Sequence, residues 1–414
     1  MLEHAARTDR LLVVPDAQRP EGGFPIVGMI GGGQLARMCQ PPAINLAVRL
    51  RVLSEEPDSS AAQAVPDAAP GDYRDETTVA AFAKGCDVVT FDHEHVPQPV
   101  LQALERDGVA VRPSASALIH AQDKLVMRRR LSTLGVPCPA WRAVSSPSEL
   151  VGFGAETGWP AVLKTPVGGY DGKGVLVVRG EDDARGAEVA DWFDRADGAP
   201  LLAEQQVPFR RELAVLVARS PMGQAAAWPV VETVQVDGVC REVIAPAPDL
   251  DRELAVRLVE TGLRIAAALG VVGVLAVEVF ETLEDDADGH PEPAFLVNEL
   301  AMRPHNSGHW TIDGAVTSQF EQHLRAVLDL PLGDTRARAP WTVMANVLGG
   351  EHPDLYRSYQ HVMARDPGLK VHLYGKGVRI GRKVGHVTVC GDDLEDCRRR
   401  ARHAAEYITG AIDG

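Results

Sequence analysis

Residues 295–311 read FLVNELAMRPHNSGHWT, and this stretch is the most informative part of the chain. An apolar run delivers Asn298 and Glu299 at its end. A dense set of charged and hydrogen-bonding side chains follows at once: Arg303, His305, Asn306, Ser307, His309 and Trp310. A strand that ends in an ordinary turn uses far fewer such groups, whereas a site for a metal, a polyphosphate and a small anion uses all of these types. We therefore predict such a site here.

A second glutamate belongs to the same site. The run VLAVEVF at 274–280 contains Glu278, and the acidic loop ETLEDDADGHPEP joins it to the run that ends near Glu299. Each glutamate alternates with apolar neighbours, so both carboxylates can point to one face of an antiparallel hairpin. With Asn298 beside them, they suit Mg²⁺, which takes few protein carboxylates together with substrate phosphates. Taken singly, either glutamate also fits an exposed strand position.

The sequence GGYDGKG at 168–174 lies between two predicted strands. Its glycines let the backbone approach a ligand closely and point N–H groups at phosphate oxygens. Lys173 adds charge, and Lys164 stands on the preceding strand. The loop is not a Walker A motif, because Gly174 stands where a Ser or Thr should follow the lysine. A plain hairpin turn made of glycines is the alternative.

Two further stretches have a weaker signal. Glu204 ends the strand LLAEQQV and Glu212 begins the next, so an adenosine could bind a backbone edge there with an acidic group on its ribose; solvated charges are the alternative. The turn GGGQLAR at 31–37 opens a helix whose first amides could hold a phosphate or another polar group. Its G-x-G-x-x-G pattern is only partly met, because Ala36 takes the last place. That variant exists, so a nicotinamide site competes here.

The densest basic cluster lies near the C-terminus, in GKGVRIGRKVGH at 375–386. It contains Lys376, Arg379, Arg382, Lys383 and His386. Such a cluster fits a receptor for an anionic group such as a phosphate. A strand edge protected by solvated charge is the alternative.

Composition limits the class of protein. A chain of 414 residues is too long for one core, so two or three domains are expected. A net charge of -15 repels nucleic acid and anionic membrane, so we expect neither as a partner. The six cysteines form no C-x-x-C pair and suit a reducing cytoplasm. No apolar run of about 18 residues predicts a membrane span.

The order of predicted elements indicates α/β and α+β domains. Residues 1–24 are expected to be a disordered extension. Alternating strands and helices predict a Rossmann-like, doubly wound parallel-sheet domain at 25–123. The proline-marked segment VPCPAWRAV is expected as a linker to a small α+β unit at about 146–205, within a larger region that spans 124–330. A further α+β unit follows at 331–414.

Together these stretches resemble the ATP-grasp superfamily and, within it, the N5-carboxyaminoimidazole ribonucleotide synthetases of de novo purine synthesis. The resemblance runs from about residue 25 to residue 386. It is carried by GGGQLARM, GGYDGKG, the NE of VNEL, RPHNSGHWT, SQFEQHLRA and YGKGVRIGRKVGH. It implies three domains, with ATP held between a small lid domain and the larger third domain.

The resemblance also implies roles for single residues. The implied ATP-binding set is Lys124, Lys164, Gly169, Tyr170, Asp171, Gly172, Lys173, Gly174, Val175, Glu204, Gln205, Gln206, Val207, Glu212, Asn298 and Glu299. Glu278 and Glu299 resemble the magnesium ligands. The implied pocket for bicarbonate and carboxyphosphate is Arg303, His305, Asn306 and Ser307. The implied contacts to the aminoimidazole ribonucleotide are Gln34, Leu35, Tyr170, Asp171, Arg303, Lys376 and Arg382. The chain departs from the family at Gln235, where a histidine is common, and at Lys124, which is an arginine in some relatives.

The implied activity is the carboxylation of 5-aminoimidazole ribonucleotide with ATP and bicarbonate, through carboxyphosphate, giving ADP and phosphate. A cytoplasmic, magnesium-dependent enzyme is expected, and a homodimer is usual for the family. One alternative is an ATP-grasp ligase for another acceptor. A nicotinamide-dependent oxidoreductase would leave GGYDGKG, the paired glutamates and RPHNSGHW without a role. A binding protein without activity is disfavoured, because the carboxylates and lysines that the chemistry needs are all present.

Overall fold

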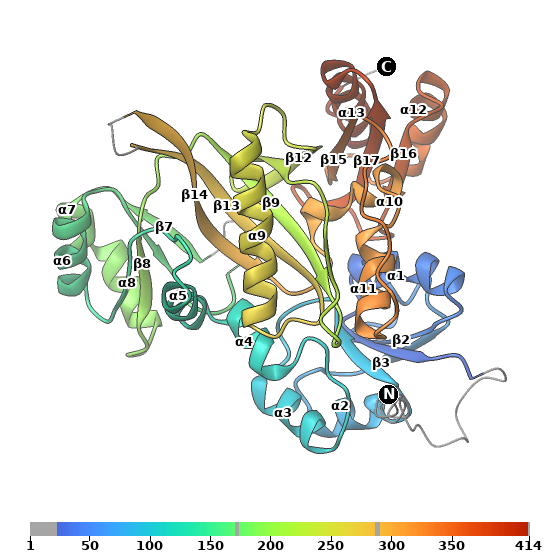
Figure 1. Cartoon of the computed structure of the whole chain (residues 1–414), viewed down its shortest axis with the longest axis horizontal. Coiled ribbons are helices and arrows are strands. Elements are labelled where there is room, and N and C mark those ends of the chain that lie inside the picture. Colours follow the sequence, from blue (N-terminus) through green and yellow to red (C-terminus); the bar gives the residue numbers. More distant parts are fainter. Residues whose placement is uncertain (1–22, 170–173, 286–289, 413–414) are drawn as a thin grey trace, which may run out of the picture.

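The computed structural model describes residues 23–169, 174–285 and 290–412. Figure 1 shows a blue and cyan N-terminal unit, a small green unit that stands apart, and a long central sheet that runs into the red C-terminal unit. Residues 1–22 of the expected extension lie outside the described residues. Within the described residues, no helix combines the length and the apolar character needed to cross a membrane.

The N-terminal unit is the predicted parallel sheet, with strand order β3-β2-β1-β4. Its elements are β1 Ile26–Ile30, α1 Gln34–Asn45, β2 Arg49–Ser54, β3 Asp67–Pro70, α2 Glu76–Ala83, β4 Val88–Phe91, α3 Gln98–Arg106 and α4 Ala115–Gln122. Strand β1 is fully buried along its length, as expected of a central strand in a parallel sheet. Strand β3 was not predicted, because its sequence DAAP has little strand propensity; it lies at the sheet edge, where proline is tolerated.

The small unit is a four-stranded antiparallel sheet of order β5-β8-β6-β7. Its elements and the helix that leads to it are α5 Lys124–Thr133, β5 Trp141–Val144, α6 Pro147–Thr157, β6 Ala161–Lys164, β7 Val175–Val178, α7 Glu181–Ala184, α8 Ala187–Arg195 and β8 Leu201–Gln205. The expectation of a plain linker before residue 146 was wrong in part. Residues 141–144 of that segment pair with β8 and form an edge strand of this sheet.

The largest sheet contains nine strands within the part of the chain that the structure describes. Its elements are β9 Arg211–Arg219, β10 Ala225–Ala227, β11 Val231–Val236, β12 Val239–Ala245, β13 Gly273–Asp285, β14 Pro291–Ala301, β15 Trp341–Leu348, β16 Lys370–Leu373 and β17 Lys383–Gly391. The order is β14-β13-β9-β11-β12-β15-β17-β16, with β10 beside β9. Because β12 pairs with β15, the sheet is continuous between the region 206–330 and the C-terminal unit.

Helices cover this sheet on its apolar faces. They are α9 Arg252–Ala268, α10 Thr311–Gly314, α11 Gln319–Val327, α12 Tyr359–Arg365 and α13 Leu394–Thr409. In Figure 1 the yellow helix α9 lies across β9 and β13. It begins at Asp251, whose carboxylate accepts the Leu254 N–H, and it buries Leu254, Leu258 and Ile265 at helical spacing.

Candidate functional site

One cleft of about 1140 Å³ lies among the three units. Its volume suits a nucleotide together with a second ligand. The predicted site residues that line it are Gln34, Leu35, Lys124, Lys164, Gly169, Val175, Glu204, Gln205, Gln206, Val207, Glu212, Glu278, Asn298, Glu299, Arg303, His305, Asn306, Ser307, Lys376 and Arg382. Gly174 closes the base of the glycine loop, where its carbonyl accepts the Thr165 N–H at 3.1 Å. The remaining predicted site residues, Tyr170, Asp171, Gly172 and Lys173, lie outside the described residues.

The two glutamates face each other across the β13–β14 hairpin. Glu278 is the direct partner of Glu299, while the next pair along the ladder is Val279 with Val297. Asn298 is therefore the extra residue of a β-bulge. A bulge places two residues of one strand opposite one residue of the other. This explains how Asn298 and Glu299, although adjacent in sequence, both line the cleft.

The carboxyl of Glu278 has an unusual pKa. Burial, the charge of Glu299 and the charge of Glu212 together raise the pKa of Glu278 to about 8. Two carboxylates that converge in this way repel each other, and a divalent cation between them would remove the repulsion. Among the described residues, no group of three or more His, Cys, Asp or Glu side chains forms a metal site. A cation here would therefore need oxygen ligands from a substrate as well.

Two lysines connect the acidic pair to the small unit. Lys124 Nζ, on α5, lies 2.7 Å from Glu299 Oε1. Lys164 Nζ, at the end of β6, lies 2.6 Å from Glu204 Oε2 and 3.4 Å from Asn298 Oδ1. Both lysines line the cleft beside the glycine loop. They place two positive charges in the cleft, where an anionic ligand would be attracted.

Arg128 was missed by the sequence reasoning. It is fully buried on α5, and its Nε lies 2.5 Å from Glu204 Oε1. Its guanidinium also donates to the carbonyls of Val297 at 3.0 Å and Asn298 at 2.7 Å, so it fixes the bulge. Burial opposes the charged form, but Arg128 and Lys164 hold the pKa of Glu204 below its usual value. The Glu204 side chain therefore serves this ion pair, and its backbone lies in the small sheet between β5 and β6.

An apolar slot lies beside this network. The rings of Phe209 and Phe280 stack with centroids 4.7 Å apart and an interplanar angle of 16°. Both rings line the cleft together with Val207, two residues after the end of β8. Glu212 stands nearby on β9, and its burial raises its pKa, opposed by the charge of Lys164. A flat base beside a short backbone edge and an acidic group fits this arrangement.

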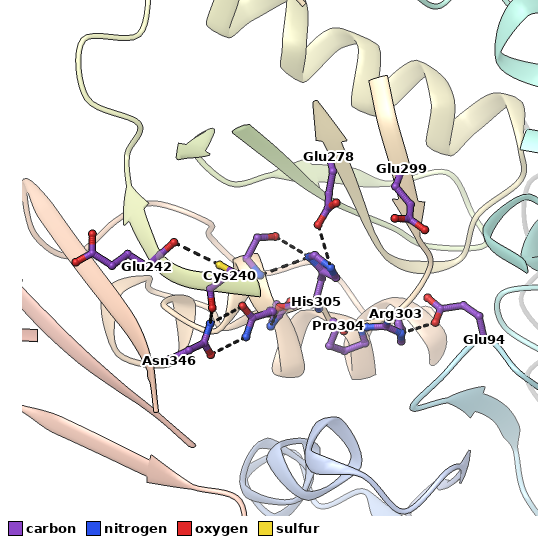
Figure 2. Close-up of polar contacts among 12 residues, drawn as sticks. Glu94, Cys240, Glu242, Glu278, Glu299, Arg303, Pro304, His305 and Asn346 are labelled. Carbon is purple, nitrogen blue, oxygen red and sulfur yellow. Dashed lines mark hydrogen bonds and ion pairs between the residues drawn. The ribbon is translucent and has the colours of Figure 1, made fainter. Parts of the chain in front are cut away.

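Arg303 begins the predicted anion pocket and is held by a residue that the sequence did not suggest. Its Nε lies 2.6 Å from Glu94 Oε2, after β4 of the N-terminal unit. Figure 2 shows the guanidinium turned toward Glu94 and His305 turned toward Glu278. Burial lowers the pKa of Arg303, but Glu94, Asp92 and Glu299 outweigh it and raise the pKa overall. Arg303 thus remains charged at the junction of two domains.

His305 is neutral and contacts Glu278, one of the two candidate metal ligands, directly. Its Nε2 lies 3.4 Å from Glu278 Oε1, and its Nδ1 lies 2.9 Å from Ser307 Oγ. The Ser307 N–H also points at Nδ1, at 3.4 Å, so Nδ1 is an acceptor and the ring proton sits on Nε2. Burial, Arg303 and Lys383 lower the pKa of His305 to about 3. The ring is therefore a hydrogen-bonding group rather than a cation.

Asn306, the remaining residue of the predicted anion pocket, is hydrogen-bonded to the C-terminal unit. The side-chain amides of Asn306 and Asn346 exchange two hydrogen bonds, at 3.0 and 2.8 Å. Asn346 lies on β15 and also donates to the Cys240 carbonyl at 2.9 Å, as Figure 2 shows. Its position in an ordinary strand gave no sequence signal. Strands β12 and β15 therefore support the pocket from behind.

The residues of the basic cluster lie in different surroundings in the structure. Lys376, Arg382 and Lys383 line the cleft. Arg379 is exposed on the same loop, and His386 is fully buried, where the Tyr374 hydroxyl contacts its Nδ1 at 2.8 Å. The Lys376 ammonium donates to the side-chain amide oxygen of Gln34, on α1. Residues 342 positions apart thus form one end of the cleft.

The N-terminal glycine turn is closed by packing. The Gly33 N–H donates to the carboxylate of buried Asp92. A Cβ at Gly33 would lie 2.3 Å from Asp92 Oδ2, and one at Gly32 would lie 2.2 Å from Ser54 Oγ. The amide at the start of α1 is thus occupied by a carboxylate rather than left for a pyrophosphate. This arrangement disfavours the nicotinamide interpretation.

Comparison with known families covers most of the chain. Residues 25–122 match the ribonucleotide synthetase preATP-grasp domain, and residues 129–320 match the ATP-grasp domain. Residues 342–400 match the phosphoribosylaminoimidazole carboxylase C-terminal domain.

Relatives and solved structures agree with these matches. The chain is 54% identical to the N5-carboxyaminoimidazole ribonucleotide synthase of Mycobacterium tuberculosis, over 93% of this chain and 88% of that protein. It is 49% identical to that of Corynebacterium ammoniagenes, over 96% and 94%. The structure of the Aspergillus clavatus synthase with ADP and 5-aminoimidazole ribonucleotide superimposes with a TM-score of 0.81, at 31% identity, over 94% of this chain and 99% of that one.

Proposed function

The chain belongs to the N5-carboxyaminoimidazole ribonucleotide synthases of the ATP-grasp superfamily, and we propose that its cleft activates bicarbonate with ATP to form carboxyphosphate. The overall reaction is the ATP-dependent carboxylation of 5-aminoimidazole ribonucleotide in purine biosynthesis. One observation carries the proposal. The acidic pair, two lysines, a neutral histidine beside a charged arginine and a separate basic cluster all line the same cleft.

ATP is proposed to lie between the small unit and the hairpin. Its adenine would occupy the slot at Phe209, Phe280 and Val207, with Glu212 near the ribose. Its phosphates would meet Lys124 and Lys164 under the glycine loop. Positive groups that already hold their places can stabilise the charge of a transferring phosphoryl group without reorganising during the reaction.

Glu278 and Glu299, with Asn298 beside them, fit Mg²⁺. The fit rests on the pairing of the two carboxylates across the hairpin. It agrees with the raised pKa of Glu278, which is caused first by burial and then by the charge of Glu299. Mg²⁺ would neutralise charge on the phosphates of the nucleotide. Glu278 must lose its proton to serve as a ligand, so Mg²⁺ affinity is expected to rise with pH toward 8.

Bicarbonate is proposed to bind at Arg303, His305, Asn306 and Ser307. The Arg303 guanidinium, held by Glu94, would attract the anion, and the polar side chains would orient it. Because carboxyphosphate hydrolyses readily, water must be kept out of this pocket. The nucleophile, the exocyclic amine of 5-aminoimidazole ribonucleotide, would approach from the side of the N-terminal unit.

The ribonucleotide is proposed to bind where α1 meets the C-terminal loop. Lys376, Arg382, Gln34 and Leu35 line this end of the cleft. An anionic substrate needs such local positive charge in a chain whose net charge is -15. By resemblance to the family, we also propose Tyr170 and Asp171 as contacts, and a homodimer in the cytoplasm.

The direct test is release of phosphate from ATP in a magnesium buffer. We expect release to depend on both bicarbonate and 5-aminoimidazole ribonucleotide, with one phosphate released for each carboxylated product. Other acceptors of ATP-grasp ligases, such as biotin, serve as controls. Stimulation by another acceptor but not by 5-aminoimidazole ribonucleotide would contradict the proposal.

A further inference from the structure

Helix α11 carries an unusual buried polar face. Gln322 and His323 lie about one helical turn after Gln319, and all three side chains are fully buried. Polar side chains in this setting are costly unless hydrogen-bonded. All three belong to the stretch SQFEQHLRA, to which the proposed function assigns no role. Their partners are backbone and side-chain groups of other segments.

Gln319 forms two hydrogen bonds to the backbone of His305. Its Oε1 accepts the His305 N–H at 2.9 Å, and its Nε2 donates to the His305 carbonyl at 2.8 Å. A backbone N–H can only donate and a carbonyl can only accept, so these two bonds determine which end of the Gln319 amide is oxygen and which is nitrogen. The peptide units on both sides of His305 are thus held by one side chain.

The remaining proton of the Gln319 amide points at a second histidine. Its Nε2 lies 2.9 Å from His309 Nδ1, which must therefore be the acceptor. The neutral His309 ring then carries its proton on Nε2. Protonation of Nδ1 would break this contact, which agrees with the lowered pKa of His309, caused first by its burial. Within the described residues, His309 Nε2 is buried without a hydrogen-bond partner, and His309 lines the cleft.

The loop is shaped around Gln319. A Cβ at Gly308 would lie 2.3 Å from Gln319 Oε1 and 2.3 Å from Leu216 Cδ2, so only glycine lets the loop pack this closely. Thr311 Oγ1 accepts the Gln319 N–H at 2.9 Å and donates to the Gly308 carbonyl at 2.6 Å. The segment from His305 to Thr311 is therefore folded against the first turn of α11.

We propose that Gln319 is a positioning residue for the carboxylation. It fixes the backbone of His305 and the tautomer of His309, and so holds the His305 ring between Glu278 and Ser307. Gln319 does not line the cleft, so it acts through these histidines and not on a substrate. The inference rests on the proposed role of His305 in the bicarbonate pocket.

The chain supplies a matched control one turn along the same helix. Gln322 is equally buried, and its side-chain amide also forms two hydrogen bonds to the backbone of a single residue. Its Nε2 donates to the Gly333 carbonyl at 2.9 Å, and its Oε1 accepts the Gly333 N–H at 2.7 Å. Neither Gln322 nor Gly333 lines the cleft. Loss of the Gln322 amide should therefore disturb the fold to a similar degree without moving His305.

The experiment compares Gln319→Met with Gln322→Met in the full chain. For Gln319→Met we expect kcat to fall roughly 10- to 100-fold and the Michaelis constant for bicarbonate to rise, because small misplacements of reacting groups have effects of this size. The Michaelis constant for ATP should stay near that of the wild type. For Gln322→Met we expect kcat and the Michaelis constant for bicarbonate to stay at their wild-type values. This should hold even if its melting temperature falls as far as that of Gln319→Met.

Two further readouts separate positioning from a merely structural role. Nitrogen NMR of the histidine rings should show His309 as the Nε2–H tautomer in the wild type and in Gln322→Met, and should lose this preference in Gln319→Met. In Gln319→Glu only the protonated carboxyl can donate, and only once. The kcat of that variant relative to wild type should therefore rise as pH falls.

The outcomes distinguish this inference from the proposed function. A wild-type protein with no phosphate release in the presence of bicarbonate and 5-aminoimidazole ribonucleotide would contradict the function itself. With the function intact, equal losses of kcat in Gln319→Met and Gln322→Met, or an unchanged His309 tautomer, would overturn the role of Gln319.

Discussion

Glu278 is the direct partner of Glu299 across the β13–β14 hairpin, and the charge of Glu299 helps to raise the pKa of Glu278 to about 8. Lys124, 2.7 Å from Glu299, offsets part of that charge. The pair thus keeps a proton at neutral pH until another positive charge replaces it. Such strain between like charges is typical of functional sites, where stability is lost in exchange for binding.

Glu278→Gln should stabilise the ligand-free protein while it lowers turnover. A carboxyl whose pKa is raised from 4.5 to about 8 by folding contributes stability that is full below about 4.5 and is lost as pH rises through 8. Glu278→Gln has no carboxyl at this position, so it does not lose stability in this way as pH rises. Its melting temperature minus that of the wild type should therefore grow between pH 5 and pH 8, as measured by thermal unfolding without magnesium.

The matched control for this pH series is Glu292→Gln, because Glu292 pairs with Glu284 across the same hairpin but is exposed. The difference in melting temperature between Glu292→Gln and the wild type should not change with pH. Added Mg²⁺ should restore stability to the wild type at pH 8 more than to Glu278→Gln. A difference for Glu278→Gln that does not change with pH would contradict the raised pKa.

Glu299→Gln should lose activity and keep its fold. The change removes one carboxylate of the proposed metal pair and the partner of Lys124. We expect turnover to fall on the order of 10²-fold or more, since a lost metal ligand weakens charge stabilisation by several kcal/mol. Steady-state kinetics at saturating Mg²⁺ measures this, with Glu292→Gln as the control. Near-normal turnover would mean that Glu299 is not a ligand.

Arg128→Met should destabilise the protein strongly. Glu204 is 2% exposed, and removal of Arg128 leaves it buried with Lys164 as its remaining cationic partner. Breaking a buried pair from one side costs about 3–5 kcal/mol, which denaturant titration can measure. The double change Arg128→Met with Glu204→Gln should recover part of this loss, because no carboxylate is then stranded. A single variant as stable as the wild type would disprove the role of this pair.

The pairing of Glu204 also predicts a pH effect. Its pKa is lowered in the folded state from the usual 4.5, so its contribution to stability is present above about 4.5 and is lost as pH falls below it. In Glu204→Gln the loss of stability on acidification should be shallower than in the wild type. Denaturant titrations at pH 7 and pH 4 compare the two proteins.

Arg382→Ala should weaken binding of the ribonucleotide. Arg382 is proposed to bind its phosphate, and loss of a charge-assisted contact of about 1.5–3 kcal/mol raises the Michaelis constant roughly 10-fold or more. The constant for ATP should move little. Arg379→Ala is the control, because Arg379 is exposed on the same loop and does not line the cleft. An effect on ATP alone would show that the substrate phosphate is placed wrongly.

Local pattern predicted most elements of the fold. Buried runs such as that of β1 and alternating runs such as those of β13 and β14 have clear periods, and the hairpin of Glu278 and Glu299 formed as expected. Strands β3 and β5 were missed, because DAAP and WRAV are short edge strands that depend on a neighbouring strand for their conformation.

The candidate site was predicted in its residues but not in its supports. Lys164 and the segment after Glu299 carry chemistry in their own sequence and do line the cleft. Lys124, which only the family resemblance implied, lines it as well. Arg128, Glu94 and Asn346 have no such signal. Each is an ordinary residue of a helix, loop or strand, and it becomes informative only when burial gives it a charged or amide partner from a distant segment.

The family, the chemical types of the site residues and the common face of Glu278 and Glu299 follow from the sequence alone, because side-chain identity and local periodicity are properties of a short stretch of chain. The folded chain was needed to show that Asn298 is the extra residue of a bulge, that Glu204 forms an ion pair with Arg128 and Lys164, and that the C-terminal strands continue the central sheet. These features arise from contacts between residues far apart in sequence. Their free energy depends on burial and on distance in space, which no local pattern records.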